Sequence, residues 1–185
     1  NDFNTIKNFN IVGGTTGILH NGSNESAFAL VKDCLIKQPS SGYAIDVYGG
    51  LGSLVLGHVS IYADPMVFGT WSGTAMRVTG GSLIMSETIV QAQVVTGIEL
   101  LNSKLTIDIT SLYYCQNGIS IKNDSQMKGT LVNLVSCYCG INVLANDIGF
   151  ANSKIAINYL HIDGATVDIN ADTSATLELY SGHID

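Results

Sequence analysis

Gly97-Ile-Glu-Leu-Leu-Asn102 decides the fold of this chain, because it returns as Gly118-Ile-Ser-Ile-Lys-Asn123 and again as Gly140-Ile-Asn-Val-Leu-Ala145. Similar glycine-led apolar stretches begin elsewhere in the chain, at Gly17, Gly42, Gly73 and Gly164. A repeat period in the twenties, as these glycines show, is typical of a solenoid, in which each unit buries its apolar face against the next copy.

The third residue after each glycine forms a column that is apolar in every copy except the first. Its members are His20, Ile45, Met76, Leu100, Ile121, Val143 and Val167. The residue before it is often polar, and this period of two is typical of a strand with one buried face. Small polar clusters such as 102–103 and 123–125 follow the strands and favour turns. Each repeat is therefore expected to contain a short strand, a polar turn, a second strand and a return.

The sequence predicts an all-β fold: a right-handed, single-stranded parallel β-helix of about seven to eight rungs, in one domain over residues 1–185. Helical repeats need long amphipathic helices, whereas charged residues are only 12% of this chain and runs such as 105–112 are rich in β-branched residues. The variable repeat length favours a right-handed helix with variable loops over a strict hexapeptide coil. Because neither end looks like a cap, we expect the chain to be a fragment, or its ends to be covered by other chains.

Composition limits the partners and cofactors that we expect. The formal net charge is −7, and the eight Lys and Arg residues are scattered along the sequence, so no nucleic-acid partner is expected. No uninterrupted apolar run is long enough for a transmembrane helix, so no membrane insertion is expected. Cys115 and Cys137 each precede a glycine by three residues and are expected to stack as reduced thiols. The spacing of Cys137 and Cys139 does not suit zinc, and we expect neither a metal nor a cofactor.

Two carboxylates are candidate catalytic groups. Glu87 and Asp108 each stand ten residues before a repeat glycine, which would place them on neighbouring rungs at the separation used by retaining glycosidases. Aligning Leu83 with Leu105 instead shifts the register by one residue, and the two side chains would then point to opposite faces. The alternative role for both is that of solvated surface residues.

The longest repeat, from Gly42 to Gly73, has spare residues that are expected to form a projecting loop. It carries the candidate substrate-binding residues Tyr62, Asp64, Phe68 and Trp71. Aromatic rings stack on sugar faces, and loops on a rigid solenoid often carry binding groups. The alternative is that Trp71 packs back on the rod or against another subunit.

These glycine-led repeats, with stacked Asn turns and no cysteine framework, resemble the right-handed β-helix, pectate-lyase-like superfamily. Its bacteriophage tailspike and appendage members look most similar. The resemblance covers nearly the whole chain and implies a scaffold whose enzymes cleave polysaccharides through clustered carboxylates, or by calcium-assisted elimination with a basic residue. The pattern of polygalacturonases, Asn-x-Asp followed by Asp-Asp, is absent, as is a cluster of acidic residues beside a basic one that would suit calcium.

Three functional hypotheses remain. In the first, the protein is a tailspike-like β-helix, in a virion tail or outside the cell, that binds a host cell-surface polysaccharide; whether it also degrades it as a depolymerase is left open. In the second, it is a noncatalytic structural or adhesin rod. A cellular polysaccharide lyase or epimerase is the third. The resemblance to tailspikes, together with apolar outward residues such as Leu101 and Leu144, predicts a parallel homotrimer.

Overall fold

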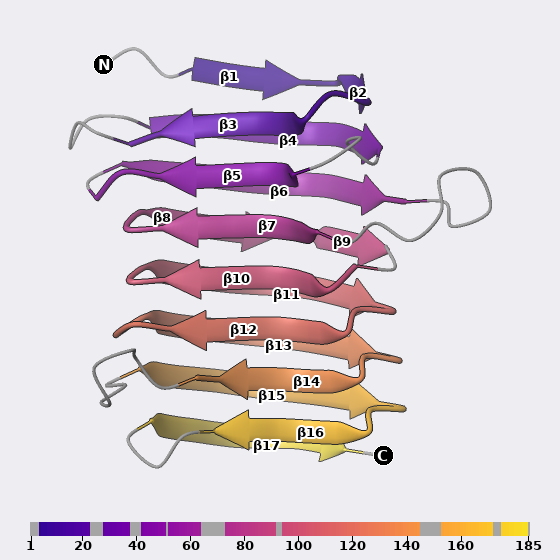
Figure 1. Ribbon diagram of the computed structural model, residues 1–185, viewed down its shortest axis with the longest axis vertical. Coiled ribbons are helices and arrows are strands. Elements are labelled where there is room, and N and C mark those ends of the chain that lie inside the picture. The colour runs from indigo at the N-terminus through magenta and orange to yellow at the C-terminus, as the bar shows by residue number, and fades with distance from the viewer. Residues whose placement is uncertain are drawn as a thin grey trace.

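Parallel strands stack along one axis through the whole of the computed structural model (Figure 1). The structure describes residues 4–22, 28–37, 42–50, 52–63, 73–91, 94–144, 153–171 and 175–184. Every strand pairing in these ranges is parallel, and none of the ranges contains a helix. The prediction of an all-β parallel solenoid is therefore confirmed.

Two sheets make up the molecule, and we call them the long sheet and the short sheet. The long sheet contains β1 (Asn4–Lys7), β2 (Asn10–Val12), β4 (Phe28–Lys37), β6 (Ser53–Tyr62), β8 (Ser82–Ser86), β9 (Thr88–Gln91), β11 (Lys104–Tyr113), β13 (Gln126–Val135), β15 (Lys154–Asp163) and β17 (Thr176–Ile184). The short sheet contains β3 (Thr16–Asn21), β5 (Tyr43–Tyr48), β7 (Thr74–Thr79), β10 (Thr96–Leu101), β12 (Asn117–Lys122), β14 (Cys139–Val143) and β16 (Val167–Ala171).

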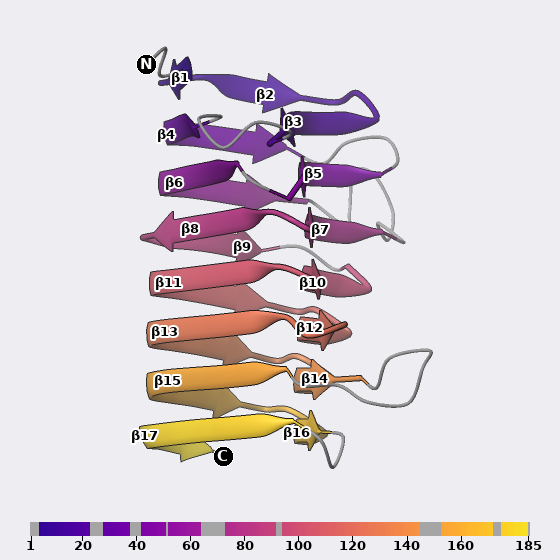
Figure 2. The ribbon, with the colours of Figure 1, turned by 90° about the vertical axis from the view of Figure 1, so that its left-hand side faces the viewer.

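The chain alternates between the two sheets, so strands that are neighbours in a sheet come from successive repeats. The long sheet runs in the order β1, β4, β6, β8, β11, β13, β15, β17, and the short sheet runs from β3 to β16 in the same direction. Figure 2 shows the two sheets as facing layers. Together the strands form a solenoid of about six turns. Its right hand and its seven to eight rungs remain predictions.

The core lies between the layers and consists of inward columns of aliphatic side chains. The predicted column is buried in six of its seven members, whereas Val167 is 38% exposed near the last turn. Its alignment needs a correction, because Ile18 lies opposite Ile45 and Ile98 lies opposite Met76. Gly17, Gly97, Gly118 and Gly140 do share one row, whose other positions are Ala44, Ala75 and Asp168 rather than Gly42, Gly73 and Gly164. The predicted alignment was thus two residues off in the first two of these copies and four residues off in the last, and an even error leaves the buried face unchanged.

Each long strand bends near its middle, where two consecutive residues point outward and the alternation changes phase. In β13, for example, Met127 and Gly129 are buried, Thr130 and Leu131 face outward, and Val132 is buried again. The bend divides the outer surface of the long sheet into two arms. The first arm carries the residues before the bend, and the second arm carries those after it. We call the second outward residue at each bend the corner row. Its members are Asn8, Asp33, His58, Glu87, Ile109, Leu131, Tyr159 and Ser181.

Buried serines support the turns that lead from the short sheet to the long sheet. The Ser103 hydroxyl donates to Val78 O at 2.7 Å and accepts from Gly80 N at 3.1 Å. Ser103 N donates in turn to Ser125 Oγ at 3.1 Å. The serine of the next rung, Ser153, is fully buried and its hydroxyl has no partner. Polar turns can therefore stack inside an apolar rod because most of their hydrogen bonds are made between rungs.

No helix in the described ranges is long and apolar enough to cross a bilayer.

Candidate functional site

Three ionisable residues occupy neighbouring positions of the corner row. The pairs Lys32–Gly57 and Cys34–Val59 place Asp33 directly opposite His58. The pairing of β6 with β8 and β9 likewise places His58 opposite Glu87. Strand register alone therefore brings together residues that are far apart in the sequence.

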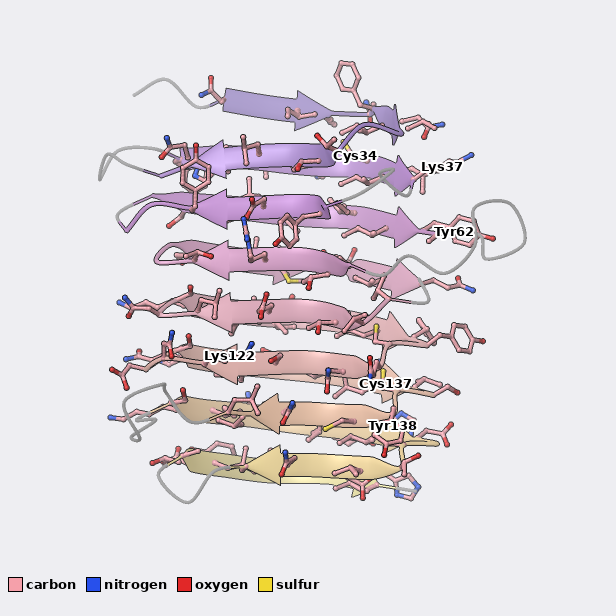
Figure 3. All side chains as sticks on the ribbon, in the orientation of Figure 1. Cys34, Lys37, Tyr62, Lys122, Cys137 and Tyr138 are labelled. Carbon is pink, nitrogen blue, oxygen red and sulfur yellow. The ribbon has the colours of Figure 1, made fainter. Side chains whose placement is uncertain are left out.

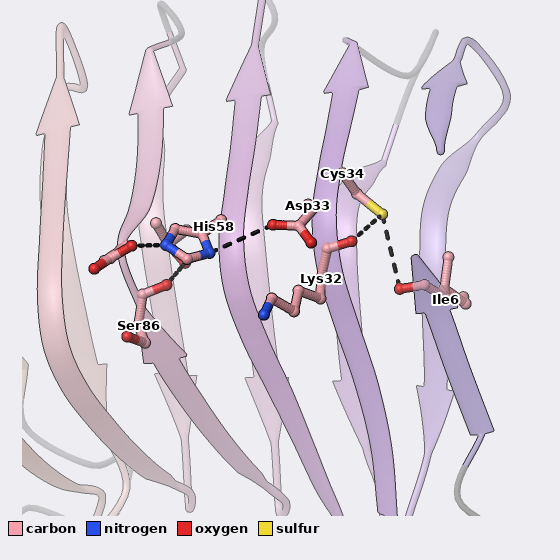
Figure 4. Close-up of polar contacts among 8 residues, drawn as sticks. Ile6, Lys32, Asp33, Cys34, His58 and Ser86 are labelled. Atoms are coloured by element: carbon pink, nitrogen blue, oxygen red, sulfur yellow. Dashed lines mark hydrogen bonds and ion pairs between the residues drawn. The ribbon is translucent and has the colours of Figure 1, made fainter. Parts of the chain in front are cut away.

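His58 lies between the two carboxylates (Figure 4). Its Nδ1 is 3.4 Å from Asp33 Oδ1, and its Nε2 forms an ion-pair contact with Glu87 Oε2. The side chains are 54%, 34% and 48% exposed for His58, Asp33 and Glu87, so solvent and ligands reach all three. The arrangement holds a hydrogen-bonding imidazole between two acceptors on the outer surface of the rod.

The backbone of this segment is unusual. Asn8, Asp33, His58 and Glu87 have φ values of 60°, 52°, 51° and 49°, which lie in the left-handed region. Asn, Asp and His tolerate this conformation, whereas a glutamate there costs about 1–2 kcal/mol. The next corner residue, Ile109, is outside the left-handed region. Strained backbone often occurs at functional sites, so the strain at Glu87 is an independent indication that this corner has a function.

The expected pairing of Glu87 with Asp108 needs a correction. Met85 pairs with Ile107 and Thr88 with Thr110, so Asp108 lies opposite Ser86 rather than opposite Glu87. The Ser86 hydroxyl is 3.5 Å from Asp108 Oδ2, while the Glu87 carboxylate contacts His58. The alternative alignment, on Leu83 and Leu105, is the observed one. Its expected consequence was wrong, because the bend leaves both carboxylates exposed on the outer surface.

Tyr62 is the one member of the predicted substrate-binding group that falls within the described residues. It ends β6, is 38% exposed and lies opposite Lys37 of β4. Figure 3 shows both side chains at the same edge of the molecule, at the ends of their strands. Asp64, Phe68 and Trp71 lie outside the described residues.

The outer face of the short sheet carries a second group of charges. Arg77 binds the two carboxylate oxygens of Asp46 at 3.0 and 2.7 Å, donates to Tyr43 Oη at 2.7 Å and lies 4.0 Å above the Tyr43 ring. The hydrogen bond with Asp46 raises the pKa of the Arg77 guanidinium, although burial lowers it. The Asp46 side chain is only 8% exposed, so this pair is more buried than a surface pair. Its contacts fit a structural role that holds β5 against β7.

The cysteines lie in the rod interior. All four are buried free thiols. Cys115 and Cys137 lie just before β12 and β14, which pair with each other, so the two cysteines stack on neighbouring rungs. A hydrogen bond with Cys137, together with burial, raises the pKa of the Cys115 thiol well above its usual value. Burial also raises the pKa of Cys139. In the described ranges no group of three or more His, Cys, Asp or Glu side chains is arranged as metal ligands.

Shallow depressions mark the surface of the described residues, and three of them lie over the long sheet or its turns. One of about 600 Å³ lies over the turns before the long strands, and one of about 430 Å³ lies over the turns after them. The third, of about 270 Å³, lies on the first arm of the long sheet. None of the three includes a member of the corner row.

Sequence reasoning missed His58 and Asp33 as partners of Glu87. The spacing from Asp33 to His58 falls within the repeat period, and this could have suggested that the two residues stack. The step from His58 to Glu87 is longer because the largest insertion of the chain lies between them. Comparison with protein-family models, with curated proteins and with solved structures finds no match for this chain.

Proposed function

We propose that this protein is a glycan-binding β-solenoid, similar in role to phage tailspike and appendage proteins, and that it attaches to a cell-surface polysaccharide. The observation that carries the proposal is the exposed row of Asp33, His58 and Glu87 on three successive rungs. Carboxylates accept hydrogen bonds from sugar hydroxyls, and charge-assisted hydrogen bonds are the stronger class.

A linear polymer suits this row because the rod repeats its side chains along one direction. Rungs are about 4.8 Å apart, so a glycan that lies along the axis meets a new polar group at each rung. Ile84 and Ile89 flank the row on β8 and β9 and are 37% and 44% exposed. They offer apolar surface for the C–H faces of sugar rings. In this proposal Tyr62, at the end of β6, extends the binding surface, and the substrate-binding roles of Asp64, Phe68 and Trp71 stay predictions from the sequence.

Cleavage of the bound polysaccharide is tested separately from its binding. Glu87 is the better candidate for the acid or base, because it contacts His58, and Asp108 lies one residue out of register on the next strand. Release of reducing ends or of unsaturated products from a bound polysaccharide, lost in Glu87→Gln, would establish a depolymerase. Binding without release would leave an attachment protein of the virion or of an extracellular surface.

A noncatalytic structural or adhesin rod is the second candidate. Exposed apolar residues favour it, since Ile109 on β11 is 40% exposed next to the two isoleucines named above. Such a face suits packing against a second and a third copy in a homotrimer. Light scattering tests the trimer, which the resemblance to tailspikes also predicts, because a stable species near the 19.6 kDa of one chain would contradict it. The absence of saccharide binding and cleavage would favour the noncatalytic rod.

The test of glycan binding compares the wild type with a double variant, Asp33→Asn with Glu87→Gln, on an array of cell-surface oligosaccharides. We expect at least a tenfold loss of affinity for the glycan that the wild type binds, because two charge-assisted acceptors are weakened. Asp163→Asn is the matched control, since it removes one exposed carboxylate at the end of β15. The proposal fails if the wild type binds no glycan, or if the double variant binds as tightly as the control.

A further inference from the structure

Three lysines gather on the first arm of the long sheet, although they are far apart in the sequence. Lys104 and Lys154 occupy the same row, with Gln126 between them. Lys128 lies on the middle strand, two residues further along. All three are exposed. The strand spacing and the rise per residue place their Cα atoms about 8 to 10 Å apart.

This cluster contradicts the expectation that the cations of the chain form no patch. The steps from Lys104 to Lys128 and from Lys128 to Lys154 are each close to one repeat, and the solenoid therefore stacks the three residues. They are three of only eight Lys and Arg residues in a chain with fifteen acidic ones. Cations that lie side by side on one outer surface attract an anion when protein carboxylates do not pair with them.

In the part of the chain that the structure describes, the three lysines form no ion pair with protein carboxylates. The Lys and Arg ion pairs of the described residues are those of Arg77 with Asp46 and of Lys122 with Glu99. Among the described residues, the acidic side chains on the same outer surface or in its turns include Asp108 on β11, Asp124 and Glu178 on β17. Asp108 contacts the Ser86 hydroxyl, and Glu178 accepts a hydrogen bond from Tyr180 Oη at 3.2 Å. Asp124 stands in the turn before β13 and has a partner of its own.

A depression lies beside Lys128 and supplies the shape of a binding site. Its volume is about 270 Å³, and it is open above Ala156, the small residue that pairs with Lys128 on β15. Its lining consists of Thr106, Ile107, Lys128, Gly129, Thr130, Ala156, Asn158 and Tyr180. Hydroxyl and amide groups thus line the depression together with Lys128, and Tyr180, also in the lining, is 69% exposed. Hydroxyl, amide, ammonium and aromatic groups together suit a sugar that carries an acidic group.

We propose that this face, which we call the lysine arm, binds an acidic glycan, with its carboxylate or sulfate groups held by Lys104, Lys128 and Lys154. The inference rests on the proposed glycan binding and names the ligand class. An acidic glycan fits better than a duplex nucleic acid, which carries one negative charge per about 1.7 Å of axis and needs many cations for counterion release, whereas this face offers three.

Part of the affinity for an anionic ligand comes from the relief of the repulsion among the three lysines. Lysines whose Cα atoms are about 8 to 10 Å apart can bring their ammonium groups within one Debye length, which is about 10 Å at 0.1 M salt, and these groups then repel one another until an anion binds between them. Higher salt screens both the repulsion and the attraction. Binding by the lysine arm should therefore weaken with salt, whereas hydrogen bonds to neutral sugars should not.

The test uses hexasaccharides of hyaluronan and of alginate, each paired with its carboxyl-reduced counterpart, which keeps the sugar backbone and loses the charge. Calorimetry at 20 mM and 300 mM NaCl compares the wild type, the single Lys→Gln variants and the triple variant. Lys32→Gln is the matched control, since Lys32 is a cation on β4 of the same sheet. We expect the wild type to bind one acidic hexasaccharide at least tenfold more tightly than its reduced form at low salt. Lys128→Gln should lose about fivefold, and the triple variant should lose the charge preference altogether.

Four outcomes would overturn the inference. They are equal binding of the acidic and reduced forms, a triple variant that keeps the preference, a Lys32→Gln loss as large as that of Lys128→Gln, and equally tight binding of a DNA duplex or of anionic vesicles. If neutral glycans bind and the lysine variants change nothing, the inference fails while the proposed function stands. If no saccharide binds at all, both fail. Circular dichroism of each variant confirms that the solenoid is folded.

Discussion

The two halves of the long sheet share one backbone plan and carry opposite chemistry. On β4, β6 and the β8–β9 pair, the corner residues Asp33, His58 and Glu87 are ionisable and left-handed. On β11, β13 and β15 the corner residues are Ile109, Leu131 and Tyr159, which are outside the left-handed region, and the three cations of the lysine arm lie on the first arm. The solenoid therefore determines the spacing and direction of the outward side chains, whereas the residue types on each rung determine the surface chemistry.

The halves also differ inside the rod, and the largest expected effect tests that difference. A Cβ at Gly118 would lie 2.6 Å from Gly140 O and 3.1 Å from a Leu134 methyl, so Gly118→Ala should lower the free energy of unfolding by about 3 kcal/mol. The N-terminal half already has Ala44 and Ala75 in this row. Gly57→Ala is the control, since its Cβ would meet only a Lys32 methylene at 3.8 Å. Urea titration measures both, and equal stability of the two variants would contradict the prediction.

The ion pairs of the short sheet come next in expected size. Arg77→Met should lower the free energy of unfolding by about 2 kcal/mol, because the mostly buried Asp46 carboxylate loses its bidentate partner. Lys122→Met in the C-terminal half should lower it by less than about 1 kcal/mol, since a single contact of 3.0 Å with Glu99 is lost. Adding Asp46→Asn to Arg77→Met should restore part of the lost stability. If Lys122→Met is the more damaging change, the assignment of Arg77 as the structural cation is wrong.

Two serines of the same buried column allow a closely matched comparison. Ser103→Ala should lower the free energy of unfolding by about 1 kcal/mol, because Val78 O loses a donor and Gly80 N loses an acceptor. Ser153→Ala should be neutral or slightly stabilising, since the Ser153 hydroxyl is buried without a partner. Thermal unfolding of the two variants tests this, and a reversed order would show that the hydrogen-bond ladder does not control turn stability.

The smallest expected effect concerns pH and the one polar member of the inward column. Burial lowers the pKa of His20 below its ordinary value of 6.5, so the folded chain keeps it neutral while the unfolded chain protonates it. The unfolded state then binds more protons below about pH 6.5, and stability falls as the pH is lowered through that value. His20→Leu should raise stability by about 0.5–1 kcal/mol at pH 7, because Nε2 has no partner, and should remove this part of the pH dependence. An unchanged slope between pH 7 and pH 5 would contradict it.

Much of the fold could be predicted from the sequence because stacking imposes a period. Gly97, Gly118 and Gly140 align as expected. Gly42 and Gly73 do not, yet the inward face stayed correct because strand faces repeat every two residues. The buried positions were therefore easier to predict than the exact register.

The candidate site was harder to predict, because surface rows depend on register to a single residue. Counting back from the glycines put Glu87 beside Asp108, whereas the bend in the strand and the pairing with β6 put it beside His58. The same dependence hid the lysine arm, whose members looked scattered until the repeats were stacked. Neither composition nor the spacing from the repeat glycines shows where a strand bends or where an insertion shifts the register.

The nearest-neighbour pairing of the strands has a mechanical consequence. Each long strand bonds only to the strands of the rungs above and below it, so a rod pulled at its two ends should open one rung at a time from an end rather than all at once. A rung of about 22 residues releases roughly 70 Å of chain when it is extended at about 3.4 Å per residue. Force applied along the chain would be dissipated in steps of that length, and a protein anchored to a surface could lose an end rung and keep the rest of its binding face.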